Sequence, residues 1–326
     1  MRVLVTGSCG FIGAHLVRLL AGKGNEVWGY DIGSYAAASW SDVEALIGDR
    51  LIKGDVCDET QVHAAIERAR PDVVYHLAAE SHVDASLLHP AKAMRVNAVG
   101  TQVVGSVCAK HDIPLVYCST DEVYGDAWGH SRPHKESAPL RPSSPYSAGK
   151  ASGEMALWAL ARSFGLRAVI TRGCNAYGPG QYPEKLVPIA CRLLQQGKQV
   201  PLHGGGHQVR QWIHVEDFAE GLEHAANYLT QGDMRTGEVV PTFNLAGPRR
   251  MSVLALVRLL AQRAGRTDKA WAKAGDRPGQ DMAYWVCHEK TERVLGWRPQ
   301  RRIDVDAPEL LKAYPADGEV RTSWTT

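Results

Sequence analysis

The chain has 326 residues, 44% of them hydrophobic, which is enough to bury a large core in one large domain or two unequal ones. Its 37 Lys and Arg nearly balance its 35 Asp and Glu, and the resulting net charge of +2 does not indicate nucleic acid as a partner. No apolar run approaches the roughly 18 residues that cross a membrane, so no membrane partner is expected.

The seven cysteines bear on the compartment and on metal binding. They are scattered along the chain, and none has the CxxC or Cys/His spacing of metal ligands. We therefore expect reduced, mostly buried thiols in a cytoplasmic protein that has no metal site.

The first half of the chain alternates between strand and helix patterns. Short apolar segments predict strands at 1–7, 25–31, 50–56, 72–80, 113–120 and 167–175. The segments between them predict helices at 10–24, 59–71, 93–111 and 143–165. Strands that alternate with helices form a parallel sheet covered on both faces, and right-handed crossovers make it doubly wound. The predicted fold class is therefore α/β, with a Rossmann-like doubly wound parallel sheet.

This regularity weakens after about residue 173. Segments 177–188 and 201–212 are rich in Gly, Pro and polar residues, which predicts loops over a site. Further patterns predict a helix at 215–229, a strand at 242–247 and helices at 251–265 and 290–297. We expect a Rossmann domain at residues 1–173. Residues 174–326 would form mainly a smaller α/β substrate-binding domain, with roughly 209–246 returning to the Rossmann domain.

A glycine-rich loop follows the first predicted strand. The segment "GSCGFIG" places Gly7, Gly10 and Gly13 where a strand turns into a helix. Glycines there let backbone N–H groups approach a pyrophosphate at the helix N-terminus. Asp31 ends the second predicted strand, where a carboxylate suits an adenosine ribose with a free 2′-hydroxyl and repels a 2′-phosphate. The loop therefore predicts a dinucleotide site, and Asp31 favours NAD over NADP.

A tyrosine and a lysine lie four residues apart in "YSAGK". On a helix, Tyr146 and Lys150 would share one face. A phenol with a pKa of about 10 is a poor base at neutral pH, and a neighbouring ammonium would lower that pKa. The pair therefore indicates a tyrosine that acts as a base, against the alternative of two surface residues.

Two adjacent acids, Asp121 and Glu122, follow the strand predicted at 113–120. Neighbouring carboxylates repel each other and are costly to remove from water. A solvated turn is the simpler interpretation of these two residues. The alternative is a paired acid and base, which would require environments that separate their two pKa values.

The motifs and the order of the elements resemble the extended short-chain dehydrogenase/reductases, above all in "TGSCGFIG" and "YSAGK". Within that group the chain is similar to the dTDP-glucose 4,6-dehydratases over nearly its whole length. The segments that carry this resemblance are "HLAAESHVDAS" (76–86), "STDEVYGD" (119–126), "PSSPYSAGKAS" (142–152), "TRGCNAYGPGQYPEKLVP" (171–188), "QVRQWIHVED" (208–217) and "RPGQD" (277–281).

The resemblance implies a lyase, NAD-dependent, acting on dTDP-glucose or a close nucleotide sugar to give the 4-keto-6-deoxy product. Tyr146 would take the O4 proton as C4 is oxidised, while Thr120 hydrogen-bonds O4 and Lys150 holds the nicotinamide ribose. Glu122 would then take the C5 proton, and Asp121 would protonate the departing C6 hydroxyl. Return of the hydride to C6 completes the reaction.

The resemblance also implies two sets of binding residues. The cofactor set comprises Gly7, Gly10, Phe11, Ile12, Gly13, Asp31, Asp55, Val56, Leu77, Ala78, Ala79, Asn97, Tyr146 and Lys150. The substrate set comprises Ser81, Asn175, Lys185, Arg210 and Arg277. Helices that contain residues 95–110 and 144–164 would pair in a homodimer.

Three motifs depart from the usual family pattern. "HVDAS" has Ala85 in place of arginine, "NAYGP" has Ala176 in place of asparagine, and "RQW" has Gln211 in place of aspartate. These changes lie in or near substrate contacts, so UDP-glucose or an amino sugar nucleotide remains open as the substrate. A 4-epimerase, a 5,6-dehydratase and a non-catalytic NAD-binding protein are the alternative functions.

Overall fold

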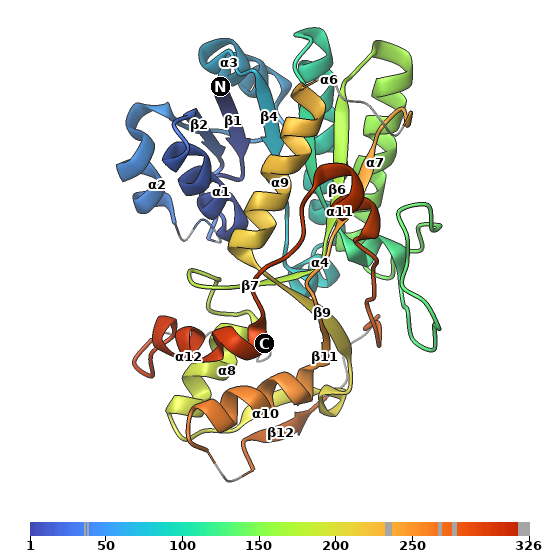
Figure 1. Cartoon of the computed structure of the whole chain (residues 1–326). Helices are drawn as coiled ribbons and strands as arrows, with labels where there is room; N and C mark the ends of the chain where they lie inside the picture. Colours follow the sequence, from blue (N-terminus) through green and yellow to red (C-terminus); the bar gives the residue numbers. More distant parts are fainter. Residues whose placement is uncertain (36, 38, 232–236, 267–268, 276–278, 319–326) are drawn as a thin grey trace.

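The computed structural model describes residues 1–326 except 36, 38, 232–236, 267–268, 276–278 and 319–326. A large part built on a parallel sheet lies above a smaller part in Figure 1. The strand order of the large sheet is β10-β6-β5-β4-β1-β2-β3, and all of its neighbouring strands run parallel. Its strands are β1 (Arg2–Thr6), β2 (Glu26–Asp31), β3 (Leu51–Lys53), β4 (Val73–His76), β5 (Leu115–Thr120), β6 (Ala168–Gly173) and β10 (Thr242–Leu245). This order is that of a doubly wound Rossmann sheet with one added strand, so the predicted fold class is confirmed.

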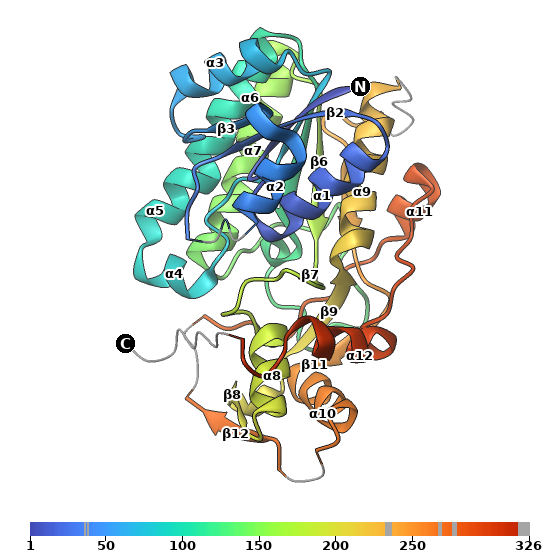
Figure 2. The same ribbon diagram turned by 90° about the vertical axis from the view of Figure 1, so that its left-hand side faces the viewer.

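Helices cover both faces of this sheet (Figure 2). One face carries α1 (Phe11–Gly22), α2 (Trp40–Ile47) and α9 (Val215–Thr230), and the other carries α3 (Glu59–Ala69), α6 (Thr101–Lys110) and α7 (Pro145–Phe164). Successive residues of a strand point to opposite faces. Accordingly, Val3 and Val5 of β1 pack in the core beside α1, whereas Leu4 packs in the core beside α3. Both cores are therefore built by the same buried strands.

The helix predicted at 93–111 contains a distortion that the sequence did not show. After α4 (Val83–Leu88), the chain forms α5 (Pro90–Met94), a π-helical turn η2 (Arg95–Gly100) and α6. Asn97 of this turn lies against α7, where a Cβ at Gly149 would approach the Asn97 Cβ to 2.9 Å. A Cβ at Gly153 would approach the Asn97 carbonyl oxygen to 2.8 Å. The two glycines thus let α7 pack closely on the π turn, which fixes the position of α7.

The smaller part has its own core. It contains a three-stranded sheet, a parallel strand pair and three helices: β7 (Asn175–Tyr177), β9 (Val209–His214), β11 (Arg250–Ser252), β8 (Val200–His203), β12 (Trp271–Ala274), α8 (Leu186–Gln195), α10 (Val253–Arg263) and α12 (Ile303–Ala313). Helix α11 (Glu289–Leu295) instead packs beside β10 and α9. The core between these helices includes Val187, Leu194, Leu256 and Leu310.

Several elements of the smaller part were not predicted. The segments predicted as loops contain the start of α8 as well as β8 and β9. Helix α12 was missed, since Pro308 lies inside it and removes the usual helical signal. The chain returns to the large sheet through α9 and β10, whereas β9 pairs with β7 and β11. The division into domains stays a prediction.

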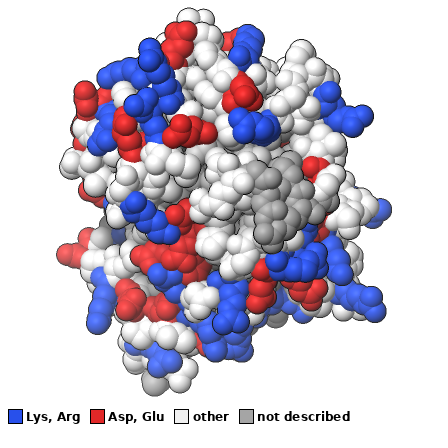
Figure 3. Space-filling model, turned by 45° about the horizontal axis from the view of Figure 1, so that its top comes forward, with Lys and Arg blue, Asp and Glu red and all other residues white. Residues whose placement is uncertain are grey.

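The surface carries charges of both signs. On the face shown in Figure 3, Lys and Arg are interspersed with Asp and Glu. Among the residues that the structure describes, no helix combines the length and the apolar character needed to cross a membrane.

Candidate active site

A cavity of about 580 Å³ lies at the carboxyl ends of the parallel strands, between the large sheet and the smaller part. This edge of an open α/β sheet is where ligands bind in doubly wound folds. Most of the predicted site residues line it: Gly7, Gly10, Phe11, Ile12, Gly13, Asp31, Asp55, Val56, Leu77, Ala78, Ala79, Ser81, Thr120, Asp121, Glu122, Tyr146, Lys150, Asn175, Lys185 and Arg210. Two predicted residues differ: Asn97 lies behind the wall, and Arg277 lies outside the described residues.

The glycine loop connects β1 to α1 at the floor of this cleft. Gly7 has φ +70°, and a Cβ there would lie 2.7 Å from the backbone nitrogen of Ala78. A Cβ at Gly13 would collide with the carbonyl oxygen of Gly7. The loop therefore holds its tight turn only with glycine, and no side chain of the N-cap residue Gly10 bonds the first backbone N–H groups of α1. This arrangement fits a dinucleotide pyrophosphate.

Asp31 occupies the end of β2, where its carboxylate is held by two backbone donors. Cys9 N donates to Oδ2 at 3.0 Å, and Gly33 N donates to Oδ1 at 2.9 Å. Each carboxylate oxygen can accept a further hydrogen bond. Asp31 can therefore accept from ribose hydroxyls, and a 2′-phosphate would meet its negative charge. These features fit NAD.

Asn97 supports the cleft wall rather than lining it. Its side chain is buried, with Oδ1 accepting from Glu80 N at 2.8 Å and Nδ2 donating to Glu80 O at 3.1 Å. Both amide atoms therefore hold the backbone that follows Leu77, Ala78 and Ala79. The side chain of Asn97 is thus engaged with the backbone of Glu80, and the predicted contact of Asn97 with the cofactor stays a prediction.

The first turn of α7 presents Tyr146 to the cleft. Ser144 caps the helix, since Ser147 N donates to Ser144 Oγ at 3.2 Å and Ser144 N donates to Ser147 Oγ at 3.1 Å. Pro145 occupies the first helical position, where its missing N–H costs nothing. The local sequence thus fixes the helix start and with it the direction of Tyr146.

Lys150 lies one turn further along α7, in a buried position. Its Nζ donates to the carbonyl oxygen of Cys118 at 2.8 Å and lies 4.8 Å from the ring centre of Tyr117. Burial lowers the pKa of Lys150 from 10.5 to about 8. The ammonium is thus held against β5, at a residue three positions before Asp121.

The phenol of Tyr146 has a pKa well above its ordinary value, which differs from the expectation. Burial is the largest cause, and the Glu122 carboxylate adds to it. A hydrogen bond with Thr120 opposes the rise. The expected lowering by Lys150 is not seen; its ammonium donates to the Cys118 carbonyl.

The acid pair lies in the 3-10 turn η3 (Asp121–Tyr124) directly after β5. Thr120 Oγ1 accepts from Glu122 N at 3.3 Å and so caps this turn. Asp121 is only 2% exposed, and its Oδ2 has no hydrogen-bond partner among the described residues. Burial, and then the charge of Glu122, raise the pKa of Asp121 well above its ordinary value. The alternative of a solvated turn is therefore wrong for Asp121, which is placed to keep and donate a proton.

Two residues close to Glu122, Tyr284 and Asp281, were not predicted from the sequence. Tyr284 donates its phenolic proton to Asp281 Oδ2 at 2.9 Å, and the phenolic oxygen of Tyr284 lies 3.5 Å from Glu122 Oε2. Arg210 lies over the Tyr284 ring at 4.2 Å and donates to the carbonyl oxygen of Asp281 at 2.8 Å. The motif "RPGQD" ends at Asp281 and was the available signal, but it was used only for Arg277.

The predicted substrate residues lie on the other side of the cleft. Lys185 Nζ donates to the carbonyl oxygen of Ser81 at 3.4 Å, which joins the large part to the smaller part. Asn175 begins β7 immediately after the end of β6. Together with Arg210, they line the same cleft as the acid pair and add one amide and two cations to it, a set that suits a sugar nucleotide.

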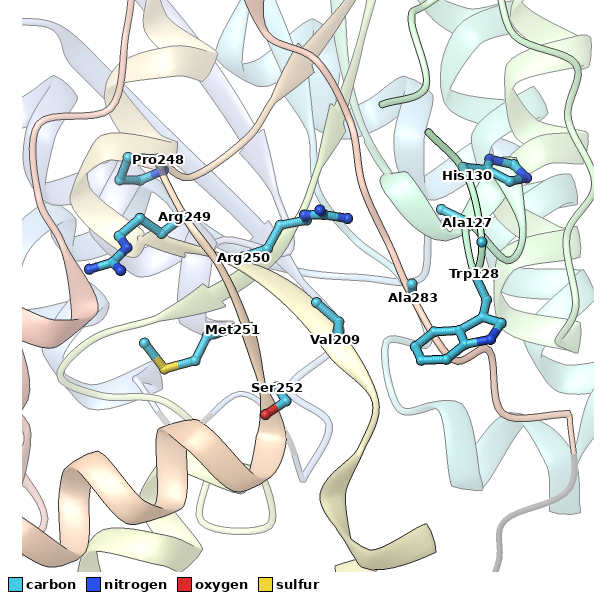
Figure 4. Close-up of a pocket in the computed structure, with 11 residues that line it drawn as sticks. Ala127, Trp128, His130, Val209, Pro248, Arg249, Arg250, Met251, Ser252 and Ala283 are labelled. Carbon is cyan, nitrogen blue, oxygen red and sulfur yellow. The ribbon is translucent and has the colours of Figure 1, made fainter. Parts of the chain in front are cut away.

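A second cavity, of about 690 Å³, lies on the reverse side of β9 (Figure 4). Trp128 lies across it from Val209 and Arg250. Side chains alternate along β9, so Val209 lines this second cavity while Arg210 lines the cleft. None of the predicted site residues lines the second cavity, so we place the active site in the cleft. Within the described residues, no three His, Cys, Asp or Glu side chains are grouped to hold a metal ion.

Residues 3–246 match the NAD dependent epimerase/dehydratase family. The chain belongs to this family. Membership confirms both the predicted resemblance to the extended short-chain dehydrogenase/reductases and the prediction of NAD as the cofactor.

Full-length relatives place this family member near the dehydratases. The dTDP-glucose 4,6-dehydratase of Streptomyces griseus is 40% identical, over 99% of this chain and 95% of the relative. The structure of a double mutant of a dTDP-glucose 4,6-dehydratase from Streptomyces venezuelae, with NAD bound, has a TM-score of 0.87 at 35% identity. That comparison covers 96% of this chain and 97% of the other. The UDP-glucose 4-epimerase of Thermotoga maritima has the same TM-score at 27% identity, covering 96% and 98%. The fold is thus common to both activities, and the residues of the cleft must separate them.

Proposed function

We propose that this chain is an NAD-dependent nucleotide-sugar 4,6-dehydratase, a hydro-lyase that converts dTDP-glucose, or a close NDP-sugar, to its 4-keto-6-deoxy form. The observation that carries the proposal is the buried Asp121 beside Glu122, in the cleft that also holds Tyr146 and Lys150. An acid kept protonated next to a base serves an elimination.

Different residues of the cleft act in the different steps of the reaction. When bound, NAD supplies a cationic nicotinamide that takes a hydride from C4 and later returns it to C6. Tyr146 takes the proton of O4, while Thr120 hydrogen-bonds that oxygen. Lys150 holds the nicotinamide ribose.

The 4-keto group makes the C5 proton acidic, and the acid pair then acts. Glu122 takes the proton from C5, and Asp121 gives its proton to the C6 hydroxyl. The C5–H and C6–O bonds break, a double bond forms between C5 and C6, and water leaves. Glu122 then returns a proton to C5 as C6 receives its hydride. The proton that Tyr146 took from O4 goes to solvent and Asp121 regains one from solvent, which returns both groups to their starting states.

A 4-epimerase is the second candidate, because a 4-epimerase has the same fold at equal TM-score. Epimerisation at C4 uses Tyr146 and Lys150 but has no use for a buried, protonated Asp121. Incubation with a panel of nucleotide sugars followed by mass spectrometry separates the two. We expect a product that has lost one water, and a product of unchanged mass would overturn the proposal.

The 5,6-dehydratase alternative also loses water, so mass does not separate it. Its product keeps the C5=C6 double bond, whereas a 4,6-dehydratase gives a C4 carbonyl and a C6 methyl group. An NMR spectrum of the product distinguishes them. The 4,6 reaction returns its own hydride, so denatured protein should release NAD and turnover should need no added reductant. A stoichiometric requirement for a reduced cofactor would contradict this.

The assembly and the compartment are also proposals. Val99 of η2 and Met155, Trp158 and Phe164 of α7 expose between 36% and 71% of their surface, although all are large and apolar. Pairing of these helices in a homodimer would cover them. All seven cysteines are free thiols, which supports a cytoplasmic location. We retain the division into an NAD-binding part at 1–173 and a mainly substrate-binding part at 174–326.

A further inference from the structure

A buried ion pair lies directly behind the acid pair. Arg172 of β6 donates through Nη2 to Glu154 Oε2 at 2.6 Å and through Nε to Glu154 Oε1 at 3.0 Å. The side chains of Arg172 and Glu154 are 6% and 0% exposed. Neither residue lines the cleft, so neither can touch a substrate there.

This ion pair is bonded to residues on both sides of the acid pair. Ser119, two residues before Asp121, donates its hydroxyl proton to Glu154 Oε1 at 2.6 Å. Tyr124, two residues after Glu122, accepts from Arg172 Nη1 at 2.8 Å. The guanidinium carbon of Arg172 also lies 4.7 Å from the Tyr124 ring centre. The turn that carries the two acids is thus anchored at its start and at its end.

The carboxylate of the ion pair belongs to α7, the helix that carries the redox residues. Glu154 lies four residues beyond Lys150 and eight beyond Tyr146, so successive turns of one helix present all three. The close contact of Gly149 and Gly153 with the π turn leaves α7 little freedom to shift. Any movement of the acid pair relative to Tyr146 would therefore have to break a bond to Glu154 or Arg172.

We propose that Glu154 and Arg172 are positioning residues that hold Asp121 and Glu122 in register with Tyr146 and Lys150. The inference rests on the proposed function, because it concerns the passage from C4 oxidation to elimination on one sugar. A buried ion pair is a weak source of stability compared with well-packed apolar side chains, but its directional bonds fix geometry. The role of this pair is thus to keep two catalytic groups at one spacing.

The sharpest test removes single hydroxyl groups. Ser119→Ala and Tyr124→Phe each delete one bond between the turn and the ion pair and leave every charge in place. Tyr124→Phe also deletes the bond from the phenol to Asn244 Oδ1 at 2.8 Å, so Ser119→Ala is the cleaner of the two. Misplacing reacting groups by about 1 Å can cost roughly 100-fold in rate. We expect elimination to slow by about 10- to 100-fold in each variant while C4 oxidation and KM stay near wild type. Reduced nicotinamide, seen by its near-ultraviolet absorbance, should then accumulate during a single turnover.

Tyr75→Phe is the matched control. Tyr75 of β4 is, like Tyr124, a buried tyrosine, but its hydroxyl has no hydrogen-bond partner among the described residues. Its removal should leave the ratio of reduced nicotinamide to dehydrated product unchanged. If Tyr124→Phe and Ser119→Ala gave the same ratio as this control, the proposal would be overturned.

A double variant separates positioning from stability. Glu154→Leu with Arg172→Met removes both charges together and keeps apolar volume, so no charge is left unpaired in the interior. We expect a folded protein that binds NAD, oxidises C4 and accumulates reduced nicotinamide. Elimination at the wild-type rate would show that the ion pair only stabilises the fold. So would an equal fall in the rates of C4 oxidation and elimination that follows the loss of folded protein. The mass of the wild-type product tests the proposed function separately, since that function fails if wild type releases no water.

Discussion

Replacing Lys150 by methionine should reveal the cost of burying its ammonium. A base with a lowered pKa destabilises the folded state below that pKa, and this cost disappears as the pH rises through the unfolded value. The pKa of Lys150 falls from 10.5 to about 8, which corresponds to a cost of about 3 kcal/mol at neutral pH. Linkage then predicts that the stability of Lys150→Met relative to wild type falls by roughly 2 to 3 kcal/mol between pH 7 and pH 10.

The assay is urea unfolding of both proteins at the two pH values, after bound NAD has been removed. The quantity to compare is the stability difference between variant and wild type at pH 7 and at pH 10, because the lost bond to the Cys118 carbonyl affects the variant at both pH values. Lys198, an exposed lysine, provides the control, since Lys198→Met should shift by the same small amount at each pH. If the difference between Lys150→Met and wild type were the same at pH 7 and pH 10, the buried-ammonium argument would be refuted.

Three further predictions concern the acids and the assembly. Glu122→Gln should keep C4 oxidation and lower elimination by about 10²–10⁴-fold, leaving reduced nicotinamide without dehydrated product, whereas Tyr146→Phe should show neither event in stopped-flow absorbance and mass spectrometry. Asp121→Asn should be more stable than wild type at neutral pH, because the raised pKa of Asp121 costs the wild type stability as the pH rises above the unfolded value of 3.8. Urea unfolding should show the stability difference between the two proteins closing towards pH 4, and the variant should lose elimination. Trp158→Asp should yield monomers by light scattering if α7 forms the dimer interface, and an unchanged mass would reject that interface.

The parts of the site that the sequence predicted depend on local structure. The glycine loop needs only a strand, a tight turn and a helix N-terminus, which neighbouring residues specify. Tyr146 and Lys150 share a helix face because four residues separate them. Asp121 and Glu122 lie at the end of a buried strand, so their place at the sheet edge follows from the strand itself. The order of the large sheet follows similarly from alternating strands and helices.

The parts that the sequence did not predict depend on contacts between distant segments. Tyr284 lies beside Glu122 although 162 positions separate them in the sequence, and the residues around Tyr284 have neither helical nor strand periodicity. Glu154 was predicted in a helix and Arg172 in a strand, but no spacing rule shows that their side chains meet. The direction of Lys150 was also missed, because the Cys118 carbonyl to which it donates belongs to β5, 32 positions earlier in the chain.

The charge of Glu122 connects the two halves of the proposed reaction. That charge raises the pKa of both Asp121 and Tyr146, after burial, which is the larger cause for each. It therefore helps Asp121 to keep its proton, and it opposes the loss of the Tyr146 proton that oxidation needs. Once Glu122 takes the C5 proton its charge is neutralised, and the pKa of Asp121 falls. Asp121 thus becomes the stronger acid at the step in which the C6 hydroxyl must leave. An adjacent pair of carboxylates is costly to remove from water, and it gains this timing because one short turn holds both members in the same cleft, with Asp121 buried.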